Sequence, residues 1–401
     1  MYIALLGRQP ELSIAELERV FTNVAWFSPE AATINTTKTI DIQKLGGSQK
    51  VGRVALELPT TDWRRVSDGI VKHYTTAWAA RDGKITLGLS AYGFKTTPRD
   101  VQKTGIILKG KLKASGVSLR LIPNQDVALS SATAHHNKLG LSANKVELLI
   151  IRGKTSTIVA ESTGAQNITA LAARDQGRPR RDAFVGMLPP KLAQIMINMA
   201  GPLAADPTQD LAQPRILDPF CGTGVLLQEA MLMGYGVYGT DLSEKMIRFT
   251  RDNLNWLQDK YSLDGHWYLH EGDAMDTTWQ QPIAAVVGET YLGQPFSAPP
   301  SAAKLTEVRG NCNHIISSFL RNLANQIAPG TPVVIAVPAW RSTSGELTHL
   351  PLTTSIERYG FERIPLTTVQ SDRLLYSRPD QVVGRELLLM RRSAAGTENK
   401  K

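Results

Sequence analysis

The chain has 401 residues and a net charge of +9, with 42% hydrophobic residues, 45 lysines and arginines and 36 aspartates and glutamates. This length suits two or three domains, and the apolar content excludes a largely disordered chain. With two cysteines, no signal-peptide pattern and no apolar run of membrane-spanning length, the sequence predicts a cytoplasmic protein that has no membrane span and no disulfide framework.

The first 200 residues carry the whole basic excess. They contain 27 basic and 15 acidic residues, a balance of +12, whereas residues 201–401 contain 18 and 21, a balance of −3. Such asymmetry indicates a nucleic-acid-binding half joined to a half with another task. A mildly basic domain without such a partner gives the same pattern, so charge alone leaves both interpretations open.

The first half alternates strand and helix patterns. Up to about residue 75, a strand at 2–6, a helix at 10–21 and a strand ending at 58 predict a small α/β sandwich. Residues 76–172 predict a second α/β unit, with strands at 84–93, 117–123 and 145–153 and a helix at 98–116.

The helix expected at 98–116 is strongly basic. It contains Lys103, Lys109, Lys111 and Lys113. A lysine-rich helix is often only a solvated face, but in the basic half of this chain it is also a candidate for phosphate contacts.

An arginine-rich segment follows at residues 173–185. Its basic residues are Arg174, Arg178, Arg180 and Arg181, and they surround a glycine and a proline. This composition predicts an irregular connector at a domain boundary. The connector is either a solubilising linker or a strip that contacts phosphates.

The second half consists of successive βα units. Strands are expected at 215–218, 237–242, 266–274, 283–290, 331–339, 365–370 and 384–392, and helices at 225–234, 243–258 and 311–327. Such alternation predicts a doubly wound, mostly parallel sheet with helices on both faces. Ligands of such folds bind at the carboxyl ends of the strands.

A glycine-containing loop closes the first of these strands, with the sequence Asp218-Pro-Phe220-Cys-Gly222-Thr-Gly224. Glycines allow the backbone to approach a ligand closely, and the following helix presents free amides. The pattern resembles the cofactor loop of class I S-adenosylmethionine methyltransferases. A tight strand–helix turn without a ligand is the alternative.

The next two strands also end in acids. Asp241, beside Leu242, ends the second strand and can accept hydrogen bonds from ribose hydroxyls. Asp273, beside Ala274, ends the third and can accept from an adenine amine, while flanking apolar side chains hold the ring. Although an acid at one strand end is often a helix cap, three in succession predict an S-adenosylmethionine site.

The fourth strand ends in Glu289-Thr-Tyr291-Leu-Gly293. Glu289 can hold the N–H groups of an exocyclic amine and direct its lone pair to a methyl donor, and Tyr291 can stack the base. The alternative is a strand-end glutamate that faces solvent. The histidines are scattered, so no metal site is expected.

These motifs resemble the THUMP-domain tRNA guanine-N(2)-methyltransferases that modify guanosine ten of tRNA. The similar stretches include "YIALLGRQPELSIAELERVF", "IQKLGGSQKVG", "GRPRRDAFVGMLPPKLAQIMINMAG" and "LDPFCGTGVLLQEA". The resemblance implies a ferredoxin-like domain (1–75), a THUMP RNA-binding domain (76–172), the connector (173–185), a Rossmann-like methyltransferase domain (186–393) and a tail (394–401). It also implies tRNA as partner, and some relatives require a small activator subunit.

The family's catalytic loop reads Asp-Pro-Pro-Tyr-Gly, whereas this chain has Glu289-Thr-Tyr-Leu-Gly293. Without the proline pair, the φ angles of the loop are not preset. The main hypothesis is a methyltransferase that acts on the exocyclic amine of a tRNA guanosine. The rivals are an RNA-binding protein with a degenerate catalytic domain and a DNA amino-methyltransferase.

Overall fold

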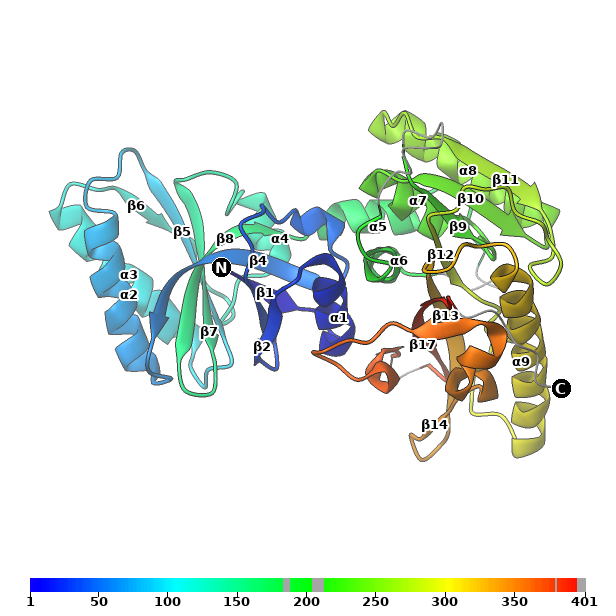
Figure 1. The fold of residues 1–401 in the computed structure, drawn as a ribbon. Helices are drawn as coiled ribbons and strands as arrows, with labels where there is room; N and C mark the ends of the chain where they lie inside the picture. The colour runs from blue at the N-terminus through cyan, green and yellow to red at the C-terminus, as the bar shows by residue number, and fades with distance from the viewer. Residues whose placement is uncertain (183–187, 204–212, 379–380, 395–401) are drawn as a thin grey trace. The chain divides into compact units, whose positions relative to one another are not determined.

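A computed structural model describes residues 1–182, 188–203, 213–378 and 381–394 (Figure 1). The chain divides into two compact units, Met1–Leu171 and Ala172–Lys401. Parts of the predicted connector, of the predicted catalytic domain and of the tail lie outside the described residues. Among the described residues, no helix is both long and apolar enough to cross a membrane.

The first unit is built on one eight-stranded sheet of order β2-β3-β1-β4-β8-β7-β5-β6. Its strands are β1 (Tyr2–Leu6), β2 (Val24–Ser28), β3 (Ala31–Ile34), β4 (Ser48–Leu58), β5 (Ile85–Tyr92), β6 (Leu119–Leu121), β7 (Lys145–Arg152) and β8 (Thr157–Ala165). Neighbours are antiparallel except β5, which runs parallel to β6 and β7. Strands of both predicted N-terminal domains therefore share one sheet, and the division at residue 75 stays a prediction.

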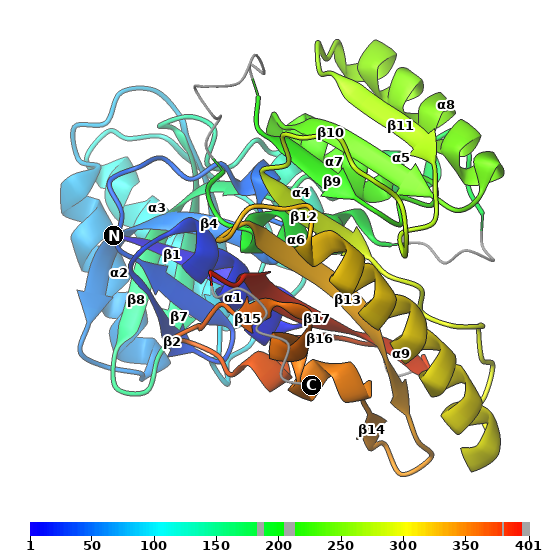
Figure 2. The same ribbon diagram turned by 45° about the vertical axis from the view of Figure 1, so that its right-hand side comes forward.

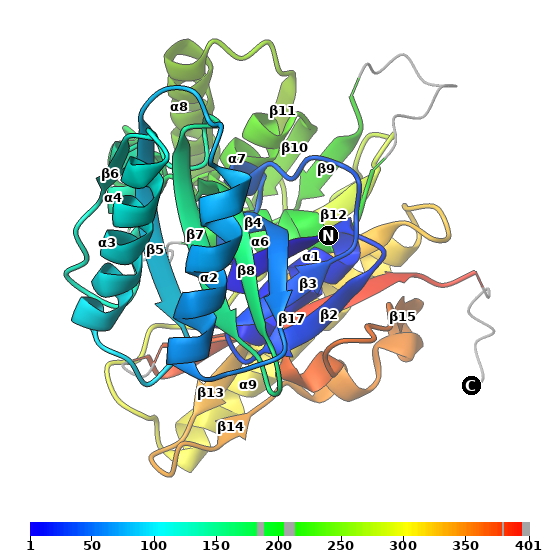
Figure 3. The same cartoon turned by 90° about the vertical axis from the view of Figure 1, so that its left-hand side faces the viewer.

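Helices cover this sheet. They are α1 (Pro10–Val20), α2 (Trp63–Ala77), α3 (Pro98–Ala114) and α4 (Ser131–His136), and α5 (Ile168–Gln176) crosses the division between the units. Figure 3 shows α2 and α3 side by side on one face, where they pack on β5, β7 and β8. A capping box between Thr97 and Asp100 begins α3 and satisfies its first amides.

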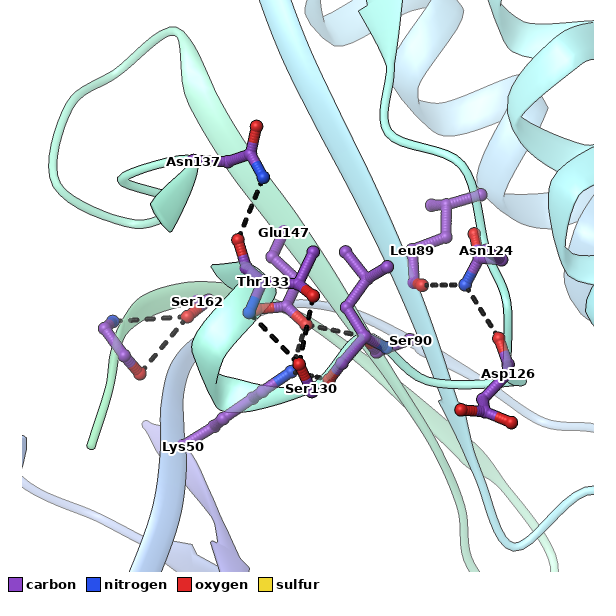
Figure 4. Close-up of polar contacts among 12 residues, drawn as sticks. Lys50, Leu89, Ser90, Asn124, Asp126, Ser130, Thr133, Asn137, Glu147 and Ser162 are labelled. Carbon is purple, nitrogen blue, oxygen red and sulfur yellow. Dashed lines mark hydrogen bonds and ion pairs between the residues drawn. The ribbon is translucent and has the colours of Figure 1, made fainter. Parts of the chain in front are cut away.

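A buried polar cluster lies inside the first unit (Figure 4). Lys50 on β4 forms an ion pair with Glu147 on β7, and both side chains are buried. Ser90 Oγ donates to Glu147 at 2.6 Å and accepts from the Leu129 amide at 2.9 Å, while Lys50 donates to the Leu129 carbonyl at 2.6 Å. The cluster thus fixes the segment before α4 on the sheet.

The second unit contains a nine-stranded sheet among its described residues. Its strands are β9 (Arg215–Asp218), β10 (Gly236–Asp241), β11 (Trp267–Glu271), β12 (Ala285–Glu289), β13 (Pro332–Arg341), β14 (Leu347–Thr348), β15 (Phe361–Arg363), β16 (Leu375–Tyr376) and β17 (Val383–Arg392). The run β11-β10-β9-β12-β13 is parallel, and β17 is antiparallel to β13. The predicted doubly wound α/β class is confirmed, and its order reverses between β9 and β12.

The helices of this unit are α6 (Pro190–Met199), α7 (Val225–Met233), α8 (Glu244–Tyr261) and α9 (Ala302–Ala324). Figure 2 shows α9 along one face of the sheet, over β12 and β13, with α6 behind them. The core under α9 joins Phe319 and Leu320 to Val333, Ile335 and neighbouring side chains. This packing fixes the strand ends that carry the site.

Three local predictions need correction. Residues 365–370 are not a strand; the strand is β15, which pairs with β17 and ends just before Pro365, a residue that has no amide to donate. The helix expected at 311–327 begins earlier, at Ala302, because Ser301 caps it. The segment expected to be irregular from residue 173 is helical to Gln176.

Candidate functional site

The strand ends at the reversal of the sheet surround a cavity of about 680 Å³. Nine of the predicted site residues line it: Asp218, Phe220, Gly222, Asp241, Leu242, Asp273, Ala274, Glu289 and Tyr291. Such a volume suits a ligand of nucleoside-cofactor size. One continuous cavity therefore joins the predicted cofactor side to the predicted acceptor side.

The glycine loop is held by the helix behind it. Gly224 caps α7 with a φ of +80°, and a Cβ built there would lie 2.8 Å from Thr250 Cγ2 on α8. Thr250 Oγ1 donates to the Gly222 carbonyl at 2.8 Å. Gly224 does not itself line the cavity, so its contribution is to let the loop turn against α8.

Asp241 ties two strand ends together. Its two carboxylate oxygens accept from the Gly222 amide and the Ser243 amide, each at 2.9 Å. Burial raises its pKa, and the two backbone hydrogen bonds act in the opposite direction. Each oxygen keeps further acceptor capacity for a ligand hydroxyl.

The adenine side is arranged in a similar way. Asp273 Oδ1 accepts from the Met275 amide at 2.9 Å, and Asp273 Oδ2 has no hydrogen bond among the described residues. Leu242 is 69% exposed although it lines the cavity, and Ala274 is buried. An apolar side chain left open at a cavity wall fits a flat ring that would cover it.

Asp218 is the buried acid of the cavity lining. Burial raises the pKa of Asp218 well above the usual carboxyl range, and the nearby carboxyl groups of Asp241 and Glu289 raise it further. The Phe220 amide donates a hydrogen bond to Asp218 at 3.1 Å and lowers this pKa. Three carboxyl groups that line the cavity are thus near enough to influence one another. This arrangement favours a cationic ligand group, such as a sulfonium or an ammonium.

We expect Asp218→Asn to stabilise the protein at pH 8 in the absence of ligand. Because the folded pKa of Asp218 is raised, ionisation costs more in the folded than in the unfolded chain, and stability falls as pH rises from the ordinary carboxyl pKa to the folded value. Asparagine removes this penalty and keeps an acceptor for the Phe220 amide. Calorimetry should show Tm higher by about 2 °C or more at pH 8, with a smaller difference near pH 4. An unchanged or lower Tm at pH 8 would contradict the assignment.

The fourth strand end is rigid without prolines. Thr290 donates to the Ala336 carbonyl through both its amide, at 3.0 Å, and its hydroxyl, at 2.9 Å. Gly293 has a φ of +82°, and a Cβ there would lie 2.8 Å from Val308 on α9. Tyr291 between them is 42% exposed and lines the cavity, which suits a ring that stacks on an incoming base.

Glu289 has a partner that the sequence did not indicate. Arg385 on β17 forms an ion pair with it through Nε and Oε1, and both side chains are largely buried. Sequence reasoning also missed Asn311 and Ile315 of α9 and the ion pair of Lys245 with Asp182, which all lie at the cavity. Arg385 and Glu386 stand together just before the apolar run of β17, and nothing in the sequence assigns either of them a partner.

The predicted RNA-contacting residues differ in their surroundings. Lys103, Lys109, Lys111 and Lys113 are all exposed on α3. Arg180 forms an ion pair with Asp252 at 2.7 Å. Arg178 is buried, and burial lowers its pKa. Arg174 forms a buried bidentate ion pair with Glu229. The α3 lysines are therefore better placed than Arg178 for contacts with phosphates.

No group of three or more His, Cys, Asp or Glu side chains in the described part of the chain could hold a metal ion. The cavity, by contrast, fits S-adenosylmethionine. It has a glycine loop that follows a parallel strand, acceptors for a ribose and an adenine amine, an open apolar wall, and a buried carboxyl group, Asp218, that two further carboxyl groups influence.

Comparisons with known proteins agree with this assignment. Residues 178–338 match the family described as an RMKL-like methyltransferase domain. A tRNA (guanine(10)-N2)-dimethyltransferase of Methanothermobacter thermautotrophicus is 31% identical over 166 residues, 41% of this chain and 43% of that protein. A protein of the same name from Pyrococcus abyssi is 42% identical over 69 residues, 17% of this chain and 18% of that protein. The chain thus covers less than half the length of these relatives.

A solved structure with a similar fold is TrmN from Thermus thermophilus, with a TM-score of 0.52 and 16% identity over 98% of this chain and 99% of that one. The match to a methyltransferase domain supports S-adenosylmethionine as the cofactor. The matches agree with the family resemblance that the motifs predicted, and residues 178–338 of the second unit match a methyltransferase domain.

Proposed function

We propose that the protein is an S-adenosylmethionine-dependent tRNA methyltransferase that acts on the exocyclic amine of a guanosine, at position ten as in the named relatives. One observation carries the proposal: Glu289 and Tyr291 line the same cavity as the three acids of the cofactor side. An amine bound by Glu289 would therefore be beside the methyl donor.

On the cofactor side, the residues bind and orient. Asp241 would accept hydrogen bonds from the ribose hydroxyls, and Asp273 from the adenine amine. Leu242 would pack against the adenine ring. Asp218, with Gly222 beside it, lies at the amino-acid end. S-adenosylmethionine supplies an electrophilic methyl group on a positively charged sulfur.

On the substrate side, the task is to direct a poorly nucleophilic amine. Its lone pair is delocalised into the base, so Glu289 must hold an N–H group and turn the lone pair toward the methyl group. Tyr291 stacks the base after it leaves its helix. Catalysis is then mostly positioning. No strong base is required, because the nitrogen loses its extra proton, to Glu289 or to water, only once it carries the methyl group, and S-adenosylhomocysteine is the other product.

In this proposal the first unit binds tRNA. Residues 1–75 form a ferredoxin-like domain and 76–172 a THUMP domain, joined by the connector at 173–185 to the catalytic domain at 186–393. The basic excess of residues 1–200 and the exposed lysines of α3 support this assignment. The enzyme acts in the cytoplasm, and an activator subunit belongs to the proposal by resemblance alone.

We expect replacement of Lys103, Lys109, Lys111 and Lys113 by glutamine to weaken tRNA binding. Each lysine that neutralises a phosphate releases a counterion, so the slope of log Kd against log salt concentration should fall by roughly one unit for each such lysine replaced. The control is Lys260→Gln on α8, an exposed lysine of the second unit. Filter binding between 50 and 300 mM salt (about the range in which this effect is large) measures both variants. An unchanged slope in the quadruple variant would exclude α3 from the tRNA interface.

The proposed activity is tested by incubating the protein with methyl-labelled S-adenosylmethionine and either bulk unmodified tRNA or duplex DNA. Label in tRNA supports the proposal, and label in DNA supports a DNA amino-methyltransferase. Binding of cofactor and tRNA without label transfer supports an RNA-binding protein with a degenerate catalytic domain.

A further inference from the structure

The carboxylate of Glu289 is held from outside the cavity. Glu289 lines the cavity, whereas Arg385 does not. Glu289 stands opposite Ala336 of β13, and Arg385 of β17 stands opposite Pro338 of the same strand. The guanidinium thus reaches Glu289 across β13, from the antiparallel strand that completes the sheet.

The ion pair uses one of the two carboxylate oxygens. Arg385 Nε donates to Glu289 Oε1, and Oε2 has no hydrogen bond among the described residues. The exposed fractions of the two side chains are 8% for Arg385 and 13% for Glu289, so the pair is largely shielded from water. A hydrogen-bonded ion pair in such surroundings restricts the rotation of the carboxylate and leaves Oε2 as the acceptor for a ligand.

The surrounding carboxyl groups favour a cation beside Glu289. Asp218 is buried next to Glu289 and Asp241, and both of these carboxyl groups raise its pKa. Like charges this close repel one another, and a buried carboxylate without a cation costs several kcal/mol (order of magnitude). Arg385 offsets this repulsion for the carboxylate that the proposed reaction uses.

We propose that Arg385 is a positioning residue for methyl transfer, which fixes Glu289 with Oε2 presented to the amine of the substrate. The inference rests on the proposed function. The loop has no prolines, and Thr290 and Gly293 fix its backbone. Arg385 restricts the side chain of Glu289, which could otherwise rotate. The residue would act through Glu289, because Arg385 itself does not line the cavity.

The test compares Arg385→Gln with the parent and with Arg391→Gln, which breaks a similar but exposed ion pair at the other end of the same strand. Arg385→Gln should lower kcat for tRNA methylation by at least 10-fold (about the smallest effect expected when a positioning interaction is removed). KM for S-adenosylmethionine and Kd for S-adenosylhomocysteine should stay within about 2-fold, because the cofactor side is intact. Arg391→Gln should retain the parent kcat.

Two further variants keep the test decisive if Arg385→Gln folds poorly. Arg385→Lys retains a cation and should recover part of the missing kcat. Adding Arg385→Gln to Glu289→Gln removes both charges and should cost little beyond Glu289→Gln alone, since residues that act as a unit are not additive. The inference is overturned if the parent is active and Arg385→Gln has the same kcat. It is also overturned if the losses of kcat from Arg385→Gln and Glu289→Gln multiply in the double variant. A parent that methylates no RNA overturns the proposed function itself, and the inference with it.

Discussion

Replacing Glu289 with glutamine is expected to lower kcat for methylation of tRNA by about 100-fold, the effect typical of one preorganised polar group at a reacting atom. Glutamine keeps the length of the side chain and an oxygen that accepts from Arg385, so the loop should retain its conformation. It replaces the second acceptor oxygen by an NH₂ donor, which cannot hold an amine N–H group. Steady-state kinetics with saturating cofactor measure the change.

The matched control is Glu386→Gln. Glu386 is also a buried carboxyl, on the strand that carries Arg385, but it pairs with His349 at 2.7 Å and does not line the cavity. Its replacement should leave kcat within about 3-fold of the parent, because the residues that line the cavity are unchanged. Equal rates for Glu289→Gln and the parent would remove the carboxylate from the mechanism.

Replacing Gly224 with alanine is expected to weaken binding of S-adenosylhomocysteine by at least 10-fold and to lower Tm. At a φ of +80°, an L side chain costs about 1–2 kcal/mol, and the new Cβ would lie 2.8 Å from Thr250 Cγ2. Thr250 cannot withdraw freely, because its hydroxyl holds the Gly222 carbonyl. Relief of the clash must therefore move the loop that faces the cofactor. Isothermal titration calorimetry measures the affinity.

Gly234→Ala separates backbone strain from the loss of the site. Gly234 ends the same helix with a φ of +97°, but a Cβ there would meet no atom within 4 Å. This variant should lose a similar amount of stability to strain and keep the parent's affinity for S-adenosylhomocysteine. If both variants bind with the parent's affinity, the packing of Gly224 on Thr250 is irrelevant to the cofactor.

The cofactor side could be predicted from the sequence because its determinants are local. Asp218, Asp241 and Asp273 each follow their own strand, and the parallel order of the strands brings them to one edge. The start of α9 at Ala302 was also open to prediction from the Ser301 cap, which accepts from the Lys304 amide. Tertiary contacts change little in the local structure that such patterns predict.

The partners of the acceptor side could not be predicted in the same way. Arg385 lies 96 residues from Glu289 in the chain, and their ion pair depends on how β17 pairs with β13. The prediction of a strand at 365–370 was wrong for a related reason. The sheet decides which segment pairs with β17, and Pro365 has no amide to donate to that strand. Interactions across a sheet require its topology, which a single sequence leaves open.

The proposed reaction, methylation of the exocyclic amine of a guanosine in tRNA, has a product that can be identified directly. The most direct measurement is to treat unmodified tRNA with the protein and S-adenosylmethionine, digest it to nucleosides and identify the product by mass spectrometry, with mapping of the modified position. We expect N(2)-methylated guanosine at position ten and its near absence with Glu289→Gln. A methyl group on any other nucleoside, or none in tRNA that the protein binds, would contradict the proposed function.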